Sequence, residues 1–124
     1  MAGKRAPICL VTDLDDTLVG HCADGARSQA EFFEYWDRVQ RPLGSKLVYN
    51  TGRDLESFRE LQALEHLPEP DAFIGRVGCQ IFLCAAESDG ECLPACTVRD
   101  EDWTQRLMRT WPAAAVEEAV GMAK

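Results

Sequence analysis

Hydrophobic residues occur in two kinds of pattern along this chain. Apolar runs near 8–13, 47–50 and 72–74 are bounded by polar and turn-forming residues, which is typical of buried strands in a parallel sheet. In 27–40 and 54–65, hydrophobic residues recur every three or four positions, a spacing that predicts amphipathic helices. The order strand–helix–strand–helix–strand predicts an α/β fold, a Rossmann-like parallel sheet whose strands are joined by right-handed crossovers.

Each predicted helix carries its hydrophobic residues on one face. In the first, the expected core positions are Phe32, Trp36 and Val39, with Phe33 and Tyr35 widening the stripe. In the second, Asp54 is the expected N-cap. The residues expected on the inner face of this second helix are Leu55, Phe58, Leu61 and Leu64.

The pattern changes after Gly78. The apolar runs 80–84 and 91–93 flank the pair Asp89-Gly90, which predicts a β-hairpin. The acidic run 100–102 then opens a predicted helix, because negative charge is favourable at a helix N-terminus.

This C-terminal segment is expected to contain two helices. Trp103, Leu107, Met108 and Trp111 lie along the first, and both tryptophans are expected to be buried in a small cap. Pro112 begins a further short, Ala-rich helix that is expected to end near Gly121. We therefore predict an N-terminal half of a core in 1–84 and an incomplete cap in 85–124.

Composition and charge narrow the classes of partner and compartment. The 124 residues carry a formal net charge of −8, which argues against nucleic acid or an anionic membrane surface as partner. No apolar stretch is long enough to span a bilayer, and no apolar signal core precedes the first predicted strand. A cytoplasmic location with reduced cysteines is expected. Cys92 and Cys96 have a loose zinc-like spacing, but no second pair completes such a site.

The candidate chemistry lies where the first predicted strand ends. Asp13, Asp15 and Asp16 follow the run Ile8 to Thr12, and ligands of open α/β sheets bind outside the carboxyl ends of strands. In extended backbone Asp13 and Asp15 share one face while Asp16 points away. Two neighbouring carboxylates resist joint ionisation unless a cation or a shared proton relieves them. The pattern therefore indicates metal-assisted chemistry.

A second candidate segment follows the next predicted strand. Thr51 and the backbone amide of Gly52 come where that strand meets a helix N-terminus, a favourable seat for a phosphate group. Arg53 is available to contact phosphate, although an exposed arginine early in a helix is the commoner case. An Asp-rich turn is also common as a solvated loop, but the Thr-Gly-Arg segment at the expected place favours a functional site.

These two segments resemble motifs of the haloacid dehalogenase superfamily of phosphohydrolases. Residues 11–19 look like its first motif, and residues 50–53 look like its second. Residues 71–82 are similar to the segment ending in Val-Gly-x-x-Ile in sucrose-phosphate phosphatases and their relatives. Residues 100–103 resemble the opening of that family's sugar-facing cap. The similarity covers nearly the whole chain but only the front half of the family's architecture.

The resemblance implies a role for each candidate residue. Asp13 is the expected nucleophile that forms an aspartyl-phosphate, and Asp15 the expected general acid and base. Both are expected to bind Mg²⁺, which prefers one or two carboxylates together with substrate phosphate and water. The residues assigned to phosphate and substrate binding are Asp16, Thr17, Thr51, Gly52 and Arg53. The implied substrate is a small sugar phosphate similar to sucrose 6-phosphate.

The chain also departs from the family's pattern. Beyond Thr51 it has one lysine, Lys124, and no counterpart of the acidic motif that completes the Mg²⁺ site. The first strand, central in the family, becomes an edge with unpaired backbone groups, which predicts self-association. We therefore expect a truncated haloacid dehalogenase fold with the beginning of an α+β cap. A phosphatase for another sugar phosphate, and a catalytically silent phosphate- or metal-binding regulatory fragment, are the alternatives.

Overall fold

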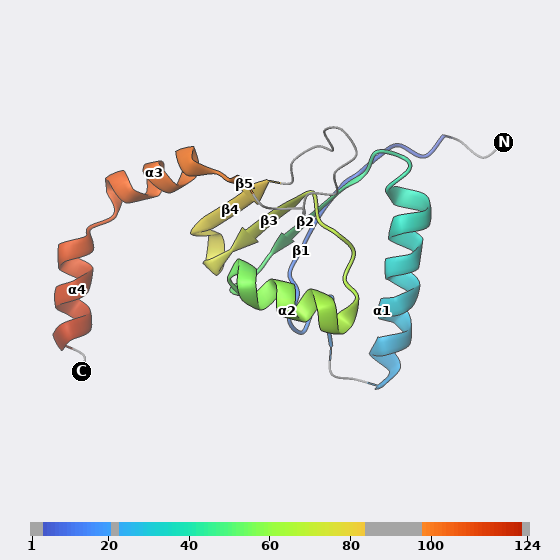
Figure 1. The fold of residues 1–124 in the computed structure, drawn as a ribbon, viewed down its shortest axis with the longest axis horizontal. Helices are drawn as coiled ribbons and strands as arrows, with labels where there is room; N and C mark the ends of the chain where they lie inside the picture. The colour runs from blue at the N-terminus through green and yellow to red at the C-terminus, as the bar shows by residue number, and fades with distance from the viewer. Residues whose placement is uncertain (1–3, 21–22, 84–97, 123–124) are drawn as a thin grey trace.

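The computed structural model describes residues 4–20, 23–83 and 98–122, and its elements follow the predicted order (Figure 1). The strands are β1 (Cys9–Thr12), β2 (Lys46–Asn50), β3 (Ala72–Gly75), β4 (Gln80–Leu83) and β5 (Val98–Arg99). The helices are α1 (Ala23–Tyr35), α2 (Leu55–Glu65), α3 (Glu101–Thr110) and α4 (Ala113–Met122). A π-helical turn, η1 (Trp36–Gln40), extends α1, and a 3-10 turn, η2 (Arg76–Gly78), follows β3.

The strands of the described residues form one sheet in the order β1-β2-β3-β4-β5. β1 pairs with β2, and β2 with β3, in parallel, so the predicted parallel α/β arrangement is confirmed. β4 and β5 join antiparallel. In the register Thr12 lies opposite Tyr49, and Tyr49 lies opposite Phe73. The carboxyl ends of β1 and β2 therefore meet at the same edge of the sheet.

The first predicted helix is longer than its pattern indicated and ends irregularly. It begins at Ala23, and its last turn is π-helical, with the Arg41 N–H donating to the Trp36 carbonyl at 2.8 Å. Phe33 and Trp36 are buried as predicted, and Phe32 packs against them from a partly buried position. The stripe of this helix is therefore core at Phe33 and Trp36, whereas Val39 and Tyr35 are half-buried and lie outside the core cluster.

The second predicted helix is confirmed, including its cap. The Asp54 carboxylate accepts the Ser57 N–H at 2.8 Å, which satisfies one of the free amide groups at the start of α2. Phe58 and Leu61 are buried, but Leu64 is 74% exposed, so its predicted burial is wrong. Each three-residue step falls about 60° short of a full helical turn, and two such steps turn Leu64 away from the face of Phe58.

The core lies on one face of the sheet. The Phe58 ring stacks on Phe73 with centroids 4.7 Å apart, and it contacts the Tyr49 ring at 5.4 Å. On the opposite face Val11 and Leu83 are 54% and 47% exposed, and none of the described helices covers them. The predicted burial of the first strand is therefore wrong. β1 is an edge strand, and that part of the prediction is confirmed.

The C-terminal helices extend away from the sheet, beyond β4 and β5 and on the far side from α1 (Figure 1). Asp100 caps α3 by accepting the Trp103 N–H at 3.0 Å, and the Trp103 indole donates to the Gly78 carbonyl at 2.8 Å. Trp111 is 54% exposed, so its predicted burial is wrong. It follows the last residue of α3 and lines an open cavity between that helix and β4.

Part of the predicted hairpin lies outside the described residues. β4 is a strand as expected and pairs antiparallel with β5, whereas the turn at Asp89-Gly90 and the run 91–93 are not described. The division into a core over 1–84 and a cap over 85–124 stays a prediction. In the part of the chain that the structure describes, no helix combines the length and apolar character needed to cross a membrane.

Candidate active site

The loop after β1 is a compact turn that is held by backbone hydrogen bonds and by two buried side chains. The Leu14 carbonyl accepts the amides of Leu18 at 3.0 Å and Val19 at 2.9 Å, and the Asp16 amide donates to the Val19 carbonyl at 2.8 Å. Leu14 and Val19 are buried in the core. Because these two apolar residues fix the turn, the carboxylates between and before them are presented to solvent at the end of β1.

Asp13 is oriented within this turn by two hydrogen bonds. One carboxylate oxygen accepts the Leu14 amide at 2.8 Å, and the other accepts the Thr17 hydroxyl at 3.4 Å. The Asp13 side chain is otherwise exposed. Thr17, expected at the phosphate site, therefore lies against the predicted nucleophile.

The backbone conformation at Asp16 differs from the expectation. Its φ of +59° lies in the left-handed region, which Asp tolerates better than most residues. The alternation of an extended strand ends before this residue, because β1 stops at Thr12. The argument that pointed Asp16 away from Asp13 and Asp15 therefore does not apply, and its side-chain direction is set by the turn.

The loop after β2 brings the second candidate segment to the same edge of the sheet. Thr51 is 4% exposed; its amide donates to the Ile74 carbonyl at 2.9 Å, and its hydroxyl accepts the Arg53 amide at 3.2 Å. Gly52 between them is exposed. A buried threonine thus anchors a loop whose glycine amide stands at the surface, just before α2 begins.

Arg53 joins the two loops. Its guanidinium donates from Nε and Nη2 to the two carboxylate oxygens of Asp15, each at 2.8 Å, and from Nη1 to the Ser57 hydroxyl at 2.9 Å. Side-chain exposures of 32% for Arg53 and 47% for Asp15 place this pair at the rim of the core. A bidentate arginine–carboxylate pair fixes orientation as well as charge.

This pair also shifts the pKa of the arginine. The hydrogen bond to Asp15 raises the pKa of Arg53, partial burial works in the opposite direction, and the negative charges of Asp15 and Glu60 add to the increase. Arg53 therefore stays a cation. The structure thus places Asp15, the predicted acid–base residue, in direct contact with Arg53, the predicted phosphate ligand.

A strained turn lies beside this loop. Arg76, Val77 and Gly78 have φ values of +49°, +57° and +88°. The left-handed region costs on the order of 1–3 kcal/mol for a non-glycine residue, and it is least favourable for a β-branched one. Two backbone bonds hold the turn in place: the Arg76 amide donates to the Arg53 carbonyl at 3.0 Å, and the Val77 amide donates to Thr51 at 3.1 Å.

The carboxylates at this site can supply only part of the coordination sphere of a magnesium ion. Asp13 offers an exposed carboxylate, whereas both oxygens of Asp15 accept from Arg53. Among the described residues, no three His, Cys, Asp or Glu side chains gather into a metal cluster. Mg²⁺ is commonly bound through one or two carboxylates together with substrate phosphates and water, so Asp13 fits such a site as one ligand.

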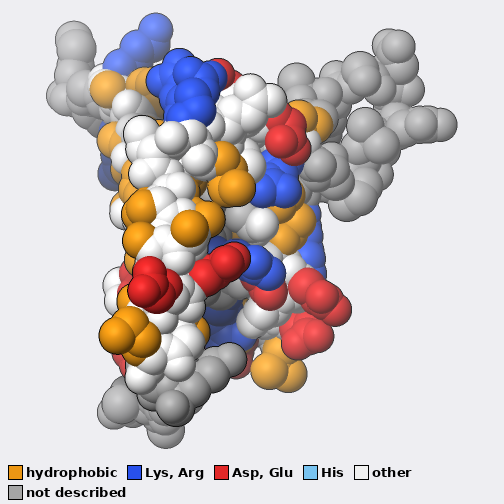
Figure 2. All heavy atoms as spheres, turned by 90° about the vertical axis from the view of Figure 1, so that its left-hand side faces the viewer, with side chains coloured by type: hydrophobic (Ala, Val, Ile, Leu, Met, Phe, Trp, Pro, Cys, Tyr) orange, Lys and Arg blue, Asp and Glu red, His pale blue; other side chains and the backbone are white. Residues whose placement is uncertain are grey.

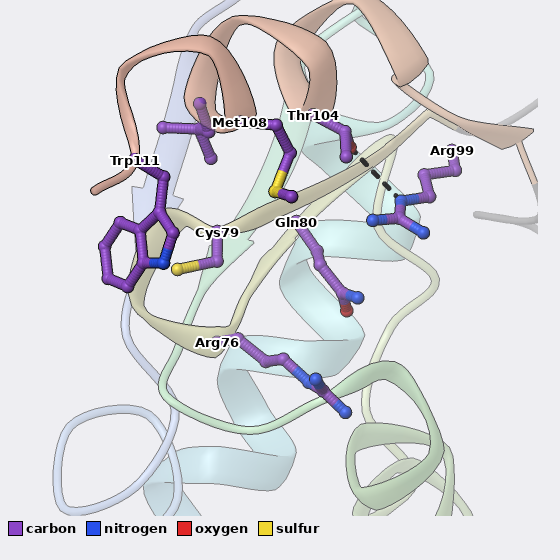
Figure 3. A pocket seen from close by; sticks show the side chains of 8 residues that line it. Arg76, Cys79, Gln80, Arg99, Thr104, Met108 and Trp111 are labelled. Carbon is purple, nitrogen blue, oxygen red and sulfur yellow. Dashed lines mark hydrogen bonds between the residues drawn. The ribbon is translucent and has the colours of Figure 1, made fainter. Parts of the chain in front are cut away.

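A separate cavity of about 240 Å³ opens between β4 and α3. Its walls are mostly apolar, and the residues that line it are Arg76, Cys79, Gln80, Arg99, Thr104, Leu107, Met108 and Trp111. Figure 3 shows Trp111 and Cys79 at one end and Arg99 at the other, where Arg99 donates to Thr104 at 3.2 Å. None of the predicted site residues lines this cavity.

The cysteines give little support to a metal site. Cys9 and Cys79 are free and exposed. Cys92 and Cys96, which carry the zinc-like spacing, lie outside the described residues.

Sequence reasoning missed two features of this site. It did not find the partnership of Arg53 with Asp15, because 38 residues separate them and only the sheet register brings them together. It also missed the left-handed turn at Val77, because Val is among the residues least expected there. The glycine that follows, Gly78, was the one available signal of a turn.

Comparison with known proteins identifies relatives of this chain. The family model described as sucrose-6F-phosphate phosphohydrolase matches residues 6–124. A probable sucrose-phosphatase from Arabidopsis thaliana is 30% identical over 112 residues, which is 90% of this chain and 24% of that protein. Mannosylfructose-phosphate phosphatase from Agrobacterium fabrum is 38% identical over 72 residues, covering 58% of this chain and 27% of that protein.

Solved structures give the same result. A sucrose-phosphatase from Synechocystis sp., solved with sucrose and phosphate, superposes with a TM-score of 0.71 and 26% identity over 94% of this chain and 40% of that one. A haloacid dehalogenase-like hydrolase protein from Bacillus subtilis superposes with a TM-score of 0.63 at 18% identity over 91% of this chain and 39% of that one. The predicted haloacid dehalogenase fold is confirmed. The chain spans about a quarter of the length of the Arabidopsis relative.

Proposed function

The chain belongs to the sucrose-6F-phosphate phosphohydrolase family, and from this premise we propose that it carries the nucleophile-bearing half of a sugar phosphate phosphatase site. The observation that supports this most strongly is the link between its two candidate loops. Asp15 follows β1, Arg53 follows β2, and their side chains meet at 2.8 Å. This link holds the exposed Asp13 and the Thr51–Gly52 seat at one edge of the sheet.

Asp13 is the proposed nucleophile. One of its carboxylate oxygens attacks phosphorus, the new O–P bond forms, and the bond from phosphorus to the sugar oxygen breaks. Water then attacks the aspartyl-phosphate, which returns the free carboxylate and releases inorganic phosphate. The bonds from Leu14 and Thr17 to Asp13 hold its oxygens in a fixed orientation for this attack.

Asp15 is the proposed proton carrier for both halves of the reaction. As an acid it gives a proton to the departing sugar oxygen, and as a base it takes one from the attacking water. The two hydrogen bonds from Arg53 favour the ionised carboxylate, which is the form needed for the second half. The hydrogen bonds from Arg53 must therefore weaken before Asp15 is protonated for the first half of the reaction.

Thr51 and Gly52 form the proposed phosphate seat, with Asp16, Thr17 and Arg53 around it. The Gly52 amide stands exposed just before α2, and helix N-termini attract anions. Asp13 would hold Mg²⁺, which when bound supplies positive charge that offsets the charge of the phosphate group. A cytoplasmic location and a substrate similar to sucrose 6-phosphate belong to the same proposal.

Phosphate release from sucrose 6F-phosphate tests this function. We expect the 124-residue chain to turn over slowly, because each missing charge-stabilising donor costs about 10²–10³-fold. Asp13→Asn should remove the remaining turnover, whereas Asp102→Asn, a matched loss of charge on α3, should not. Turnover that survives Asp13→Asn would contradict the assignment of the nucleophile.

One observation favours the alternative of a phosphate-binding chain without turnover. Both carboxylate oxygens of Asp15 accept hydrogen bonds from Arg53. In that case inorganic phosphate would bind to the Thr51–Gly52 seat while sucrose 6F-phosphate stayed intact. Calorimetric titration with phosphate, run beside the release assay, separates the two functions.

A further inference from the structure

Burial of the side chain does not account for the strained conformation of Val77. A valine at φ +57° is unfavourable, yet the isopropyl group is 84% exposed, so burial does not compensate for the strain. Strain of this kind persists where the surrounding structure imposes it, and such residues concentrate at ligand sites.

The surroundings of Val77 impose this conformation from both sides. Gly75 precedes it at a position where a Cβ would lie 2.9 Å from the Arg53 carbonyl, so the chain there passes closely over the loop after β2. The amides of Arg76 and Val77 donate to the carbonyls of Arg53 and Thr51. The turn is therefore fastened to the proposed phosphate seat and moves with it.

These backbone hydrogen bonds place the Val77 side chain next to Gly52. A Cβ built on Gly52 would lie 3.7 Å from Cγ2 of Val77. The isopropyl group of Val77 therefore lies beside the Gly52 backbone, which belongs to the proposed phosphate seat. The residue before Val77, Arg76, lines the apolar cavity between β4 and α3.

We propose that Val77 is a specificity-determining residue that contacts the apolar face of the sugar in a sugar phosphate whose phosphate group sits at Thr51–Gly52. This inference rests on the proposed function. The left-handed turn holds the isopropyl group out of the protein, where it packs on ring carbons rather than on the charged phosphate. The ligand class is a phosphorylated sugar, and the contact discriminates it from inorganic phosphate.

The experiment compares two ligands rather than one. The affinities of the 124-residue chain for sucrose 6F-phosphate and for inorganic phosphate are measured by calorimetry without Mg²⁺, and their ratio is taken. Val77→Asn keeps a residue that tolerates the left-handed region but removes the apolar group. We expect its ratio to fall about tenfold, with the affinity for inorganic phosphate unchanged, because burying a valine side chain contributes enough for that factor.

Thermal unfolding of the same variant tests the strain. Val77→Asn and Val77→Gly should both melt a few degrees above the parent chain, because each relieves the left-handed valine. Val120→Asn is an equally polar change at an exposed position of α4. It should neither raise the melting temperature nor change the ratio of the two affinities.

The outcomes separate this inference from the proposed function. An unchanged ratio in Val77→Asn, with phosphate still bound, overturns the role of Val77 and leaves the phosphate seat intact. Failure of the parent chain to bind either ligand overturns the proposed function itself. A lower melting point for both Val77 variants overturns the premise that the turn stores strain.

Discussion

The N-terminal part of this chain and its two C-terminal helices differ in how far their hydrophobic side chains are buried. In the described residues, every buried hydrophobic side chain lies between Leu14 and Phe73, packed beneath α1, η1 and α2. Neither α3 nor α4 has a buried residue. Figure 2 views the molecule from the side of these two helices and shows hydrophobic side chains at the surface with charged ones between them.

This difference follows from what each region has to pack against. α2 lies on β2 and β3, where Tyr49 and Phe73 offer a continuous apolar floor. In the described residues α3 packs beside β4 and η2 and follows the two-residue β5, and Met108 remains 65% exposed. An amphipathic helix is stabilised mainly by what covers its apolar face. The proposed chemistry accordingly lies on the region with the packed core.

The prediction with the largest expected effect concerns Asp13, the proposed nucleophile. In a turnover assay with sucrose 6F-phosphate, Asp13→Asn is expected to lower the rate by about 10³-fold or more, because no other described carboxylate has its position and exposure. Asp102→Asn on α3 should change the rate less than twofold, within the scatter of surface substitutions. Equal losses in the two variants would erase the functional contrast between the two regions.

A second test concerns stability. Phe58→Ala removes a fully buried ring that contacts both Tyr49 and Phe73, and we expect it to lower the free energy of unfolding by about 3–5 kcal/mol. Met108→Ala on α3 should cost less than about 0.5 kcal/mol. Urea denaturation measures both. A large cost for Met108→Ala would mean that α3 is covered in solution.

A third test sharpens the role of Arg53. Arg53→Met is expected to reduce kcat by about 10–10²-fold with a smaller change in KM, because Asp15 loses the group that orients it. Arg53→Lys should recover part of the loss, since it keeps the charge but not the bidentate geometry. Arg106→Met, which breaks the exposed pair with Asp102 on α3, is the matched control.

If Arg53→Met instead raised KM and left kcat unchanged, Arg53 would act as a phosphate ligand rather than as a positioning residue. The two roles are thus distinguished by which constant moves.

The smallest expected effect concerns association. β1 is an edge strand, and its Val11 and the preceding Ile8 are about half exposed, so we expect weak pairing between copies of the chain. The net charge of −8 opposes that pairing and is screened by salt. Sedimentation should therefore show a modest increase in mean mass with rising salt. A compact monomer at every salt concentration would mean that the open edge is protected.

The sequence by itself determined the local elements and the place of the chemistry. Hydrophobic periodicity located β1, β2, β3, α1 and α2, because the period of a pattern is a property of neighbouring residues. Asp54 predicted the start of α2 for the same reason, since a cap acts within one turn. The carboxylates after β1 and the Thr-Gly-Arg segment after β2 were visible from their position at strand ends.

Only the tertiary structure decided which of these residues meet. Asp15 and Arg53 come into contact because β1 and β2 pair in parallel in one particular register, and which strands become neighbours is decided by the assembled sheet rather than by either segment alone. The exposure of Trp111 depended on what packs against α3, whereas that of Leu64 follows from the helical repeat of α2. Val77 took a left-handed conformation against its own preference because hydrogen bonds to Thr51 and Arg53, on a distant segment, outweigh that preference locally.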